Sequence, residues 1–412
     1  MFWKRILLSL GLFGGTALTA LAVSISDIAG EVSEGSYSNF HINLFVEEGD
    51  SRGFTDGSSP RTPLPQHDLA RDYIFNTFQA MGFETYLAPF TFNYSGRSYT
   101  GCNNVIAIKR GTSGFIHIIG AHYDSVDSGQ SDVTGVCPGA DDNASGVAGI
   151  LETARAIQDY TFLDTIILIA FDGEEKGFFG SKHFVNNWTT TQTGQTNATR
   201  FLRANIKGML SVDMIGYDDP TTAYDVILGT VNYQRNSPLS KALEDAAATY
   251  SGVETYKSSD WDLSDHKPFD DAGIESILVI EGDYYDYWNN PPQYENPYYH
   301  TPNDNIDQPN YISYAYATDV TRMLVGYLLD QAVVIPPATL WQTFSGSTVS
   351  LNWESSPGIA YDVYGSTNLI ASNGWNVLTT VPSTPTITTH SVSFDLNAYS
   401  NRIFKVISDP EQ

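Results

Sequence analysis

The sequence predicts an α/β protein with a mostly parallel mixed sheet between layers of helices, followed by a small all-β sandwich domain. Three observations predict this fold. Apolar, β-branched runs such as TIILIAF (165–171) alternate with segments of helical periodicity from residue 67 to residue 332. These runs are apolar along their whole length, as in parallel strands that are buried on both faces. Beyond residue 335, Ser- and Thr-rich runs alternate apolar with polar residues.

The chain begins with the features of a secretory signal. Lys4 and Arg5 precede an apolar run, and Ala20-Leu21-Ala22 fits a small-residue cleavage site, so residues 1–22 are expected to be removed. A membrane anchor is the alternative interpretation, because the apolar run is near the minimum length for a transmembrane helix. We expect export to the extracellular space or the periplasm, with no membrane attachment after the signal is removed.

Composition limits the partners of the chain. It has 21 Lys and Arg residues against 47 Asp and Glu residues, a net charge of −26. This charge repels phosphate groups, so nucleic acid and anionic membranes are excluded as partners. The two cysteines, Cys102 and Cys137, could form a disulfide after export. They lack the CxxC spacing of a zinc site.

The expected elements follow from periodicity. Residues 67–81 are predicted to form an amphipathic helix, because Leu69, Tyr73, Ile74 and Phe78 recur at spacings of three to four. The other expected elements are an extended segment at 84–92, strands at 104–109, 115–121, 165–171, 206–213, 224–228 and 274–280, and helices at 145–158, 238–250 and 313–332.

Two domains are expected after the signal. Residues 23–335 would form the α/β domain, in which the polar, patternless stretch 24–36 leaves a propeptide open. Residues 336–412 would form a fibronectin-III-like β-sandwich after a Pro-containing linker. It has no catalytic constellation, and surface attachment, glycan binding and stabilisation are all open functions for it. Its aromatic residues are expected in the core and in cross-strand pairs, and they are Trp353, Tyr361, Tyr364 and Trp375.

Five short motifs place His, Asp or Glu beside small residues where a strand is expected to end. They are AHYDS (121–125), GADDNASG (139–146), FDGEEKG (171–177), SVDMIGYD (211–218) and YYHTPND (298–304). Ligands of such sheets bind beyond the carboxyl ends of the strands. A hydrolytic site with two metal ions needs about five or six N or O ligands, with one bridging carboxylate and one free base. The motifs therefore predict a two-metal hydrolase site.

The first two motifs supply a His–Asp pair and a candidate bridge. His122 is a candidate ligand at a strand end, and Asp124 can accept its second ring proton. Asp142 belongs to a pair of adjacent carboxylates and can bridge two cations. Asn143 to Ser145 could instead be a simple helix N-cap, which would explain one polar residue of the cluster.

The other three motifs supply the remaining ligands and a base. Glu174 and Glu175 follow a buried strand, where two carboxylates are costly unless a positive charge lies between them. Because side chains alternate there, one can bind metal while the other faces the water. Asp213 adds a fourth ligand and His300 a fifth. On ligand chemistry alone, manganese and cobalt are alternatives to zinc.

Together these motifs resemble the co-catalytic zinc aminopeptidases of the bacterial leucyl aminopeptidase and aminopeptidase Y type, which are related to glutamate carboxypeptidase. The resemblance covers about residues 35–332 and implies the zinc exopeptidase fold. It implies five zinc ligands, namely His122, Asp142, Glu175, Asp213 and His300.

The resemblance also implies the role of each residue. Asp142 would be shared between two Zn²⁺ ions, one held with His122 and Asp213 and the other with Glu175 and His300. Glu174 would be the general base, and Asp124 would orient His122. The peptide bond between Asp142 and Asn143 is expected to be cis.

The implied activity is that of a secreted aminopeptidase with two Zn²⁺ per chain, acting on peptide or protein N-termini. The aromatic segment 281–300 is expected to shape a pocket for an apolar first residue. Tyr284 or Tyr285 is a candidate oxyanion stabiliser. Asp265 and His266 match a family motif near the substrate site, although His266 could instead be a core histidine.

Three other functions compete with this one. A glutaminyl cyclase would have one catalytic zinc, and the intact DDNASG motif and Asp213 favour two. A carboxypeptidase would need basic residues to bind a terminal carboxylate, and this chain has few of them near the motifs. A non-catalytic binding protein on the same fold would lose ligands, whereas this chain retains all five and the base.

Overall fold

The structure is a computed structural model that describes most of the α/β domain and the strands of the C-terminal part. The described residues are 8–9, 25–44, 52–54, 61, 63–126, 138–218, 224–231, 237–259, 261–282, 296–335, 340–345, 348–354, 360–366, 376–382, 389–395 and 403–409. The chain forms two compact units. The larger contains Ser26–Gln158 and Asp164–Val333, and the smaller contains Met1–Ile25, Asp159–Leu163 and Val334–Gln412. The signal peptide and the fibronectin-III-like class of the last module stay predictions.

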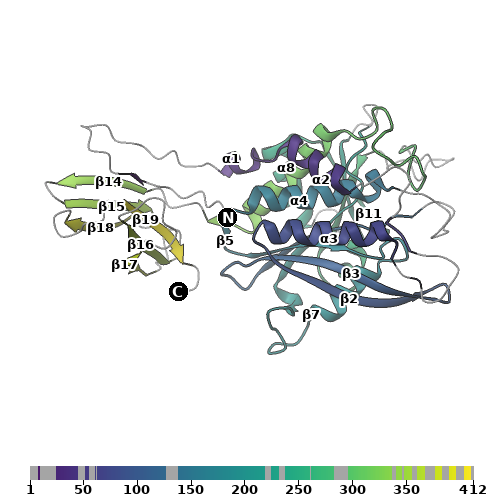
Figure 1. Ribbon diagram of the computed structural model, residues 1–412, viewed down its shortest axis with the longest axis horizontal. Helices are drawn as coiled ribbons and strands as arrows, with labels where there is room; N and C mark the ends of the chain where they lie inside the picture. Colours follow the sequence, from purple (N-terminus) through teal and green to yellow (C-terminus); the bar gives the residue numbers. More distant parts are fainter. Residues whose placement is uncertain are drawn as a thin grey trace. The chain divides into compact units, whose positions relative to one another are not determined.

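The larger unit is built on an eight-stranded sheet with the order β11-β10-β12-β9-β4-β6-β3-β2 (Figure 1). Its strands are β2 (Glu84–Tyr94), β3 (Arg97–Lys109), β4 (Ile116–His122), β6 (Thr165–Phe171), β9 (Ile206–Val212), β10 (Val226–Thr230), β11 (Thr255–Ser259) and β12 (Ser276–Glu281). The four central strands β12, β9, β4 and β6 are parallel, and β3 and β10 join them antiparallel. The predicted mostly parallel α/β fold is confirmed.

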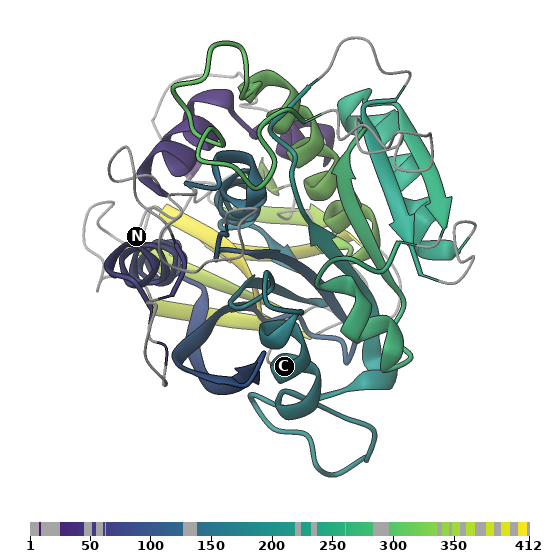
Figure 2. The ribbon, with the colours of Figure 1, turned by 90° about the vertical axis from the view of Figure 1, so that its right-hand side faces the viewer.

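Helices cover the sheet because its central strands are apolar on both faces. Every residue of β4 and β6 is buried. Ile167 and Ile169 of β6 pack in one cluster with Phe184 and Phe269, from α5 (Phe179–Asn187) and α7 (His266–Asp271). The residues that alternate with Ile167 and Ile169 along β6 point to the opposite face of the sheet. Helices α3 (Pro65–Ala80), α4 (Gly146–Ile157), α6 (Pro238–Ala246) and α8 (Tyr314–Gln331) form the other layer (Figures 1 and 2).

Helix α3 was predicted correctly, and its buried face was predicted in part, since Ile74 and Phe78 are buried as expected. Leu69 is 50% exposed, whereas His67, Ala70, Ile74 and Phe78 are buried. The cause is a polar contact that apolar periodicity cannot reveal. His67 Nε2 lies 2.9 Å from a carboxylate oxygen of Asp172, and neither side chain is exposed.

Two N-terminal helices were not predicted. They are α1 (Ile25–Ala29) and α2 (Glu34–Leu44), and α2 contacts α4 and α8. Tyr37 and His41, one helical turn apart, are fully buried. The backbone N–H of Ser33 donates to buried Glu152 of α4 at 2.7 Å. In the stretch 24–36, which left a propeptide open, Ile28, Ala29 and Val32 are buried, while most of the other described residues are exposed.

The smaller unit consists of antiparallel strands. One sheet has the order β1-β19-β16-β17, and another has the order β14-β15-β18. Their strands are β1 (Leu8–Ser9), β14 (Leu340–Ser345), β15 (Thr348–Glu354), β16 (Ala360–Ser366), β17 (Asn376–Val381), β18 (Thr389–Asp395) and β19 (Ile403–Asp409). Trp353 is buried, as expected. Trp375 and the side chains of Tyr361 and Tyr364 lie outside the described part.

The remaining elements are short. They are β5 (Thr161–Phe162) paired with β13 (Val334–Ile335), β7 (Thr189–Thr190) paired with β8 (Phe201–Leu202), and the turns η1 (Ala140–Ser145), η2 (Arg203–Asn205) and η3 (Ala247–Ser251). Among the described residues, none of the helices combines the length and the apolar character that crossing a membrane requires.

Candidate metal centre

The site forms at the carboxyl edge of the three neighbouring parallel strands β6, β4 and β9. His122 is the last residue of β4, and in the register of the sheet it lies opposite Phe171, the last residue of β6. Asp213 directly follows β9. Because parallel strands end at a common edge, residues that are about 90 positions apart in sequence meet there.

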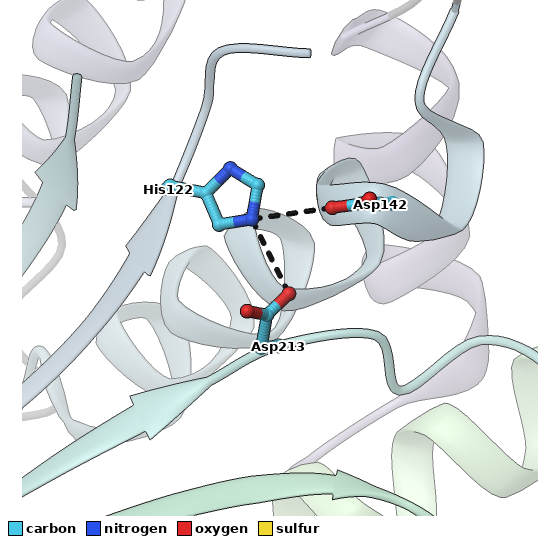
Figure 3. A group of neighbouring side chains, drawn as sticks. All are labelled: His122, Asp142 and Asp213. Carbon is cyan, nitrogen blue, oxygen red and sulfur yellow. Dashed lines mark hydrogen bonds and ion pairs between the residues drawn. The ribbon is translucent and has the colours of Figure 1, made fainter. Parts of the chain in front are cut away.

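A first group of possible metal ligands contains His122, Asp142 and Asp213, whose side chains converge in Figure 3. His122 Nε2 lies 3.2 Å from Asp142 Oδ1 and 3.3 Å from Asp213 Oδ1. All three residues are buried. Ser264, which sequence reasoning missed, donates its hydroxyl to the other oxygen of Asp213 at 2.7 Å. Its position next to Asp265 in the motif SDH was the available signal.

Asp124 lies beside His122, as predicted, but the contact is different. His122 Nδ1 is 3.1 Å from the backbone oxygen of Asp124 and 3.7 Å from its carboxylate. The carboxylate instead accepts the backbone N–H of Glu174 at 3.0 Å and that of Glu175 at 3.3 Å. Asp124 therefore contacts His122 and joins the loop after β4 to the loop after β6, while its role in orienting His122 stays a prediction.

The loop that carries Asp142 is fixed by polar side chains. The peptide bond between Asp142 and Asn143 is cis, as the resemblance implied. The amide of Asn143 donates to Val212 at 2.8 Å and accepts from Met214 at 3.2 Å. Asn143 therefore ties this loop to the end of β9.

Asp304 is a second residue that the prediction missed. It accepts the backbone N–H groups of Asp141 at 2.7 Å and of Asp142 at 3.1 Å, and it is fully buried. Burial raises its pKa to about 8, with the negative charge of Asp141 adding to the rise. The sequence placed Asp304 inside the YYHTPND motif and gave it no role.

A second group contains Asp142, Glu175 and His300. His300 Nε2 lies 2.9 Å from Asp142 Oδ2 and 3.2 Å from Glu175 Oε2. The two oxygens of Asp142 thus face different histidines, which is the arrangement of a bridging carboxylate. The His300 side chain is 25% exposed, so this group lies nearer to solvent than the first.

The charges of these groups fit a cation. Burial raises the pKa of Glu175 to about 7, with the negative charge of Asp142 adding to the rise. Its Oε1 is buried with no hydrogen-bond partner among the described residues. Burial alone would raise the pKa of Asp142, yet His122 and His300 hold it well below its ordinary value. A dense set of buried N and O donors with an orphaned carboxylate oxygen suits a divalent ion.

Glu174 belongs to neither group and lines the same pocket. Burial raises its pKa well above the ordinary value, against the opposing effect of His122. Nearby Asp265 is fully buried, and neither of its carboxylate oxygens has a hydrogen-bond partner in the described part of the chain. Burial raises the pKa of Asp265 to about 7.

The other residues that were predicted to line the pocket have different outcomes. His266 is fully buried and its Nε2 lies 2.9 Å from the Trp261 oxygen, which supports the core-histidine alternative. Burial lowers its pKa to about 4. Tyr284 and Tyr285 lie outside the described residues, as does Cys137. Cys102 is buried and its thiol is free in the structure, which argues against the possible disulfide with Cys137.

A cavity of about 300 Å³ opens above the two groups. One of its walls is apolar and rests on the cluster of Met214, Leu278 and Ile280, against which Trp261 and Tyr299 pack. The cavity places both metal-binding groups and Glu174 on one accessible surface, so a bound molecule would meet all of them.

The comparisons with known proteins agree with this geometry. Residues 104–325 match the sequence profile of peptidase family M28. Leucine aminopeptidase 1 of Trichophyton rubrum is 30% identical over 266 residues, which are 62% of this chain and 64% of that protein. The chain therefore spans somewhat less than two thirds of the length of this relative.

Two solved structures share the fold. The aminopeptidase LapA of Legionella pneumophila superposes with a TM-score of 0.58 at 20% identity, covering 78% of this chain and 79% of that one. The glutaminyl cyclase of Bacteroides thetaiotaomicron superposes with a TM-score of 0.57 at 19% identity, covering 73% and 98%. At these identities the structures support the fold and do not choose between the two reactions. Because the family profile matches more than half of the sequence, the chain belongs to peptidase family M28.

Proposed function

We propose that this protein is a secreted zinc aminopeptidase that binds two Zn²⁺ per chain and removes N-terminal, preferably apolar, residues from peptides. One observation carries the proposal. The two oxygens of Asp142 face His122 and His300 separately, and each histidine meets a further carboxylate. A family relative that is named a leucine aminopeptidase supports the same reaction.

In this proposal the five donors hold the ions, and other residues handle protons. Bound zinc would supply a water of lowered pKa and a Lewis acid for the scissile carbonyl. Glu174 is the general base. It lines the same pocket as the donors, so its carboxylate could take a proton from the attacking water and return it to the leaving amine.

The pocket favours a substrate with a free amine and an apolar side chain. Lys176 is the sole Lys or Arg among the described lining residues, so the pocket offers little to bind a terminal carboxylate, whereas a free α-amine could coordinate a bound zinc ion. The wall built on Met214, Leu278 and Ile280 would bury an aliphatic side chain of the first residue. An exopeptidase acting on apolar N-termini is the function that fits both features.

The test compares matched peptides with free and acetylated N-termini. We expect zinc-dependent release of leucine from leucine p-nitroanilide and from Leu-Ala-Ala, and none from acetyl-Leu-Ala-Ala. Equal cleavage of the acetylated peptide would contradict an aminopeptidase. Export is tested separately, by following the full-length chain and a chain without residues 1–22 into the culture medium.

Cyclisation of N-terminal glutamine is the second candidate reaction, because a glutaminyl cyclase is among the solved structures that share this fold. A cyclase would convert an N-terminal glutamine into a lactam and release ammonia without cleaving the peptide bond. We expect Gln-Ala-Ala to yield free glutamine instead. Ammonia release with an intact peptide would replace the proposal by the cyclase.

A further inference from the structure

Arg52 makes an unusual set of contacts beneath the metal centre. It is 3% exposed. Its Nε donates to the backbone oxygen of Tyr123 at 2.7 Å, and one terminal nitrogen donates to the backbone oxygen of Gly139 at 2.9 Å. The other terminal nitrogen donates to the backbone oxygen of Pro138. One guanidinium therefore holds main-chain oxygens of two different loops.

These two loops carry the predicted ligands. Tyr123 lies between His122 and Asp124, and Gly139 lies three residues before Asp142. The backbone of Arg52 adds two further contacts, because its N–H donates to the Ser125 hydroxyl at 3.1 Å and its carbonyl accepts the Ser125 N–H at 3.3 Å. A planar guanidinium with donors in a fixed fork sets the spacing of its acceptors. Arg52 thus fixes the distance between the loop of His122 and the loop of Asp142.

Helix α2 supports the second loop from another side. The Tyr37 hydroxyl donates to the backbone oxygen of Ser145 at 2.8 Å. His41 Nε2 lies 2.7 Å from the backbone oxygen of Ala140, and its Nδ1 lies 3.2 Å from the Tyr314 hydroxyl. A carbonyl oxygen can only accept, so Nε2 carries the proton. Both ends of the turn that contains Asp142 are held by side chains of α2.

Gly139 packs closely against Arg52 and Ser125. Its φ of 62° is in the left-handed region. A Cβ at this position would lie 2.7 Å from a terminal nitrogen of Arg52 and 2.8 Å from the Cβ of Ser125. The loop can approach Arg52 only because residue 139 has no side chain. The glycine of the GADDNASG motif and Arg52 therefore form one unit.

We propose that Tyr37, His41 and Arg52, which we call the N-terminal brace, are positioning residues of the metal centre. The inference rests on the proposed function, because it takes the site to bind metal. All three residues precede the part of the chain that matches the family profile, residues 104–325. The brace holds carbonyl oxygens of the ligand loops, so it sets the geometry of His122 and Asp142 before an ion binds. A mature enzyme must then retain α2 and Arg52.

The test replaces Arg52 by Lys and measures zinc affinity by competition with a chromogenic chelator. Arg203→Lys is the matched control, because Arg203 is half-buried and likewise donates to a backbone oxygen, that of Val185 at 3.0 Å. We expect Arg52→Lys to weaken zinc binding roughly tenfold to hundredfold, as losses around ligands do. It should lower kcat with little change in KM. Arg203→Lys should leave the zinc affinity at the wild-type value.

His41 supplies an independent pair of variants in case Arg52→Lys does not fold. A Gln side chain can place its amide N–H near the position of Nε2, whereas Leu cannot donate. We expect His41→Leu to bind zinc at least roughly tenfold more weakly and His41→Gln to restore most of that loss. Wild-type zinc affinity in both Arg52→Lys and His41→Leu would overturn the inference. A wild-type protein that binds no zinc would instead overturn the proposed function.

Discussion

The two metal-binding groups share Asp142 and differ in how the rest of the protein holds them. In the first, His122 ends a central strand, Asp213 directly follows another, and Ser264 fixes the second oxygen of Asp213. In the second, Glu175 has an unpartnered buried oxygen within the described residues, and His300 is 25% exposed with a φ of 53° on a turn. Both groups line the pocket, but the first is built onto the ends of sheet strands, whereas the second contains the most exposed ligand, His300.

This difference indicates that one group is suited to binding an ion tightly and the other to adjusting its ligands. A buried, pre-ordered ligand set loses little conformational freedom when an ion binds, so it is expected to bind more tightly. A ligand that is partly exposed on a turn, as His300 is, can adjust its position more easily. We therefore expect the His122 group to hold the tighter ion and the His300 group to hold the more exchangeable one.

Removing the shared residue should have the largest effect. In Asp142→Ala both groups lose a ligand, so we expect less than one zinc per chain and a fall in kcat on the order of 10⁴-fold. Metal analysis after dialysis and hydrolysis of leucine p-nitroanilide measure the two effects. Two tightly bound ions in this variant would show that Asp142 is not shared.

Single-histidine variants should separate the groups. We expect His300→Ala to keep one tight zinc per chain and to lose the weaker one. His122→Ala should weaken the tight site at least roughly 100-fold, because it removes a direct ligand from a buried set. Zinc titration followed by calorimetry distinguishes them. Equal zinc stoichiometry and affinity in the two variants would contradict the claim that the His122 group holds the tighter ion.

At low pH, protonation of His41 should weaken its support of the turn that contains Asp142. Burial lowers the pKa of this residue from 6.5 to about 4, so the folded state takes up its proton at lower pH than the unfolded state does. The stability contributed by neutral His41 is fully present above pH ~6.5 and is lost as the pH falls towards ~4, by up to about 3 kcal/mol. Urea unfolding at pH 7.5, 6 and 5 in EDTA should show a shallower pH slope for His41→Gln. An unchanged slope would contradict this account.

The smallest effect is expected from removing the Ser264 hydroxyl, which contacts a ligand of the first group alone. Ser264→Ala removes the hydroxyl that holds Asp213 at 2.7 Å, so the tight site should weaken by about tenfold. The weaker site should not change, because the Ser264 hydroxyl bonds to Asp213 and Ser211 rather than to a ligand of that site. Two-site zinc titration checks this, and a loss at both sites would show that the groups are not separable.

Much of the site could be predicted because its signals are local. Each ligand stands where an apolar run meets small polar residues, and the carboxyl ends of parallel strands must meet at one edge. That reasoning located His122, Asp142 and Asp213 without knowledge of the strand order. It also located regular elements, since residues 165–171 form a fully buried strand and the strand expected at 206–213 is found at 206–212, buried except for Lys207.

The missed features depend on contacts between distant residues. Arg52 reaches a carbonyl oxygen 71 positions away, and nothing in its neighbours marks it. Helix α2 was missed because Tyr37 and His41, which carry its buried face, are polar at their tips. In α3 the prediction wrongly included Leu69 and omitted His67, which is buried through its contact with Asp172. Side-chain contacts with main-chain oxygens leave no periodic signal in the sequence.

The most direct test of the proposed function measures zinc content and leucine p-nitroanilide hydrolysis together, in the wild type and in Glu174→Gln. Glu174 belongs to neither metal-binding group but lines the same pocket. The account predicts two zinc ions per chain in both proteins and a fall in kcat of roughly 10²- to 10⁴-fold in the variant. Unchanged kcat in Glu174→Gln, or full activity of the wild type with one ion, would contradict it.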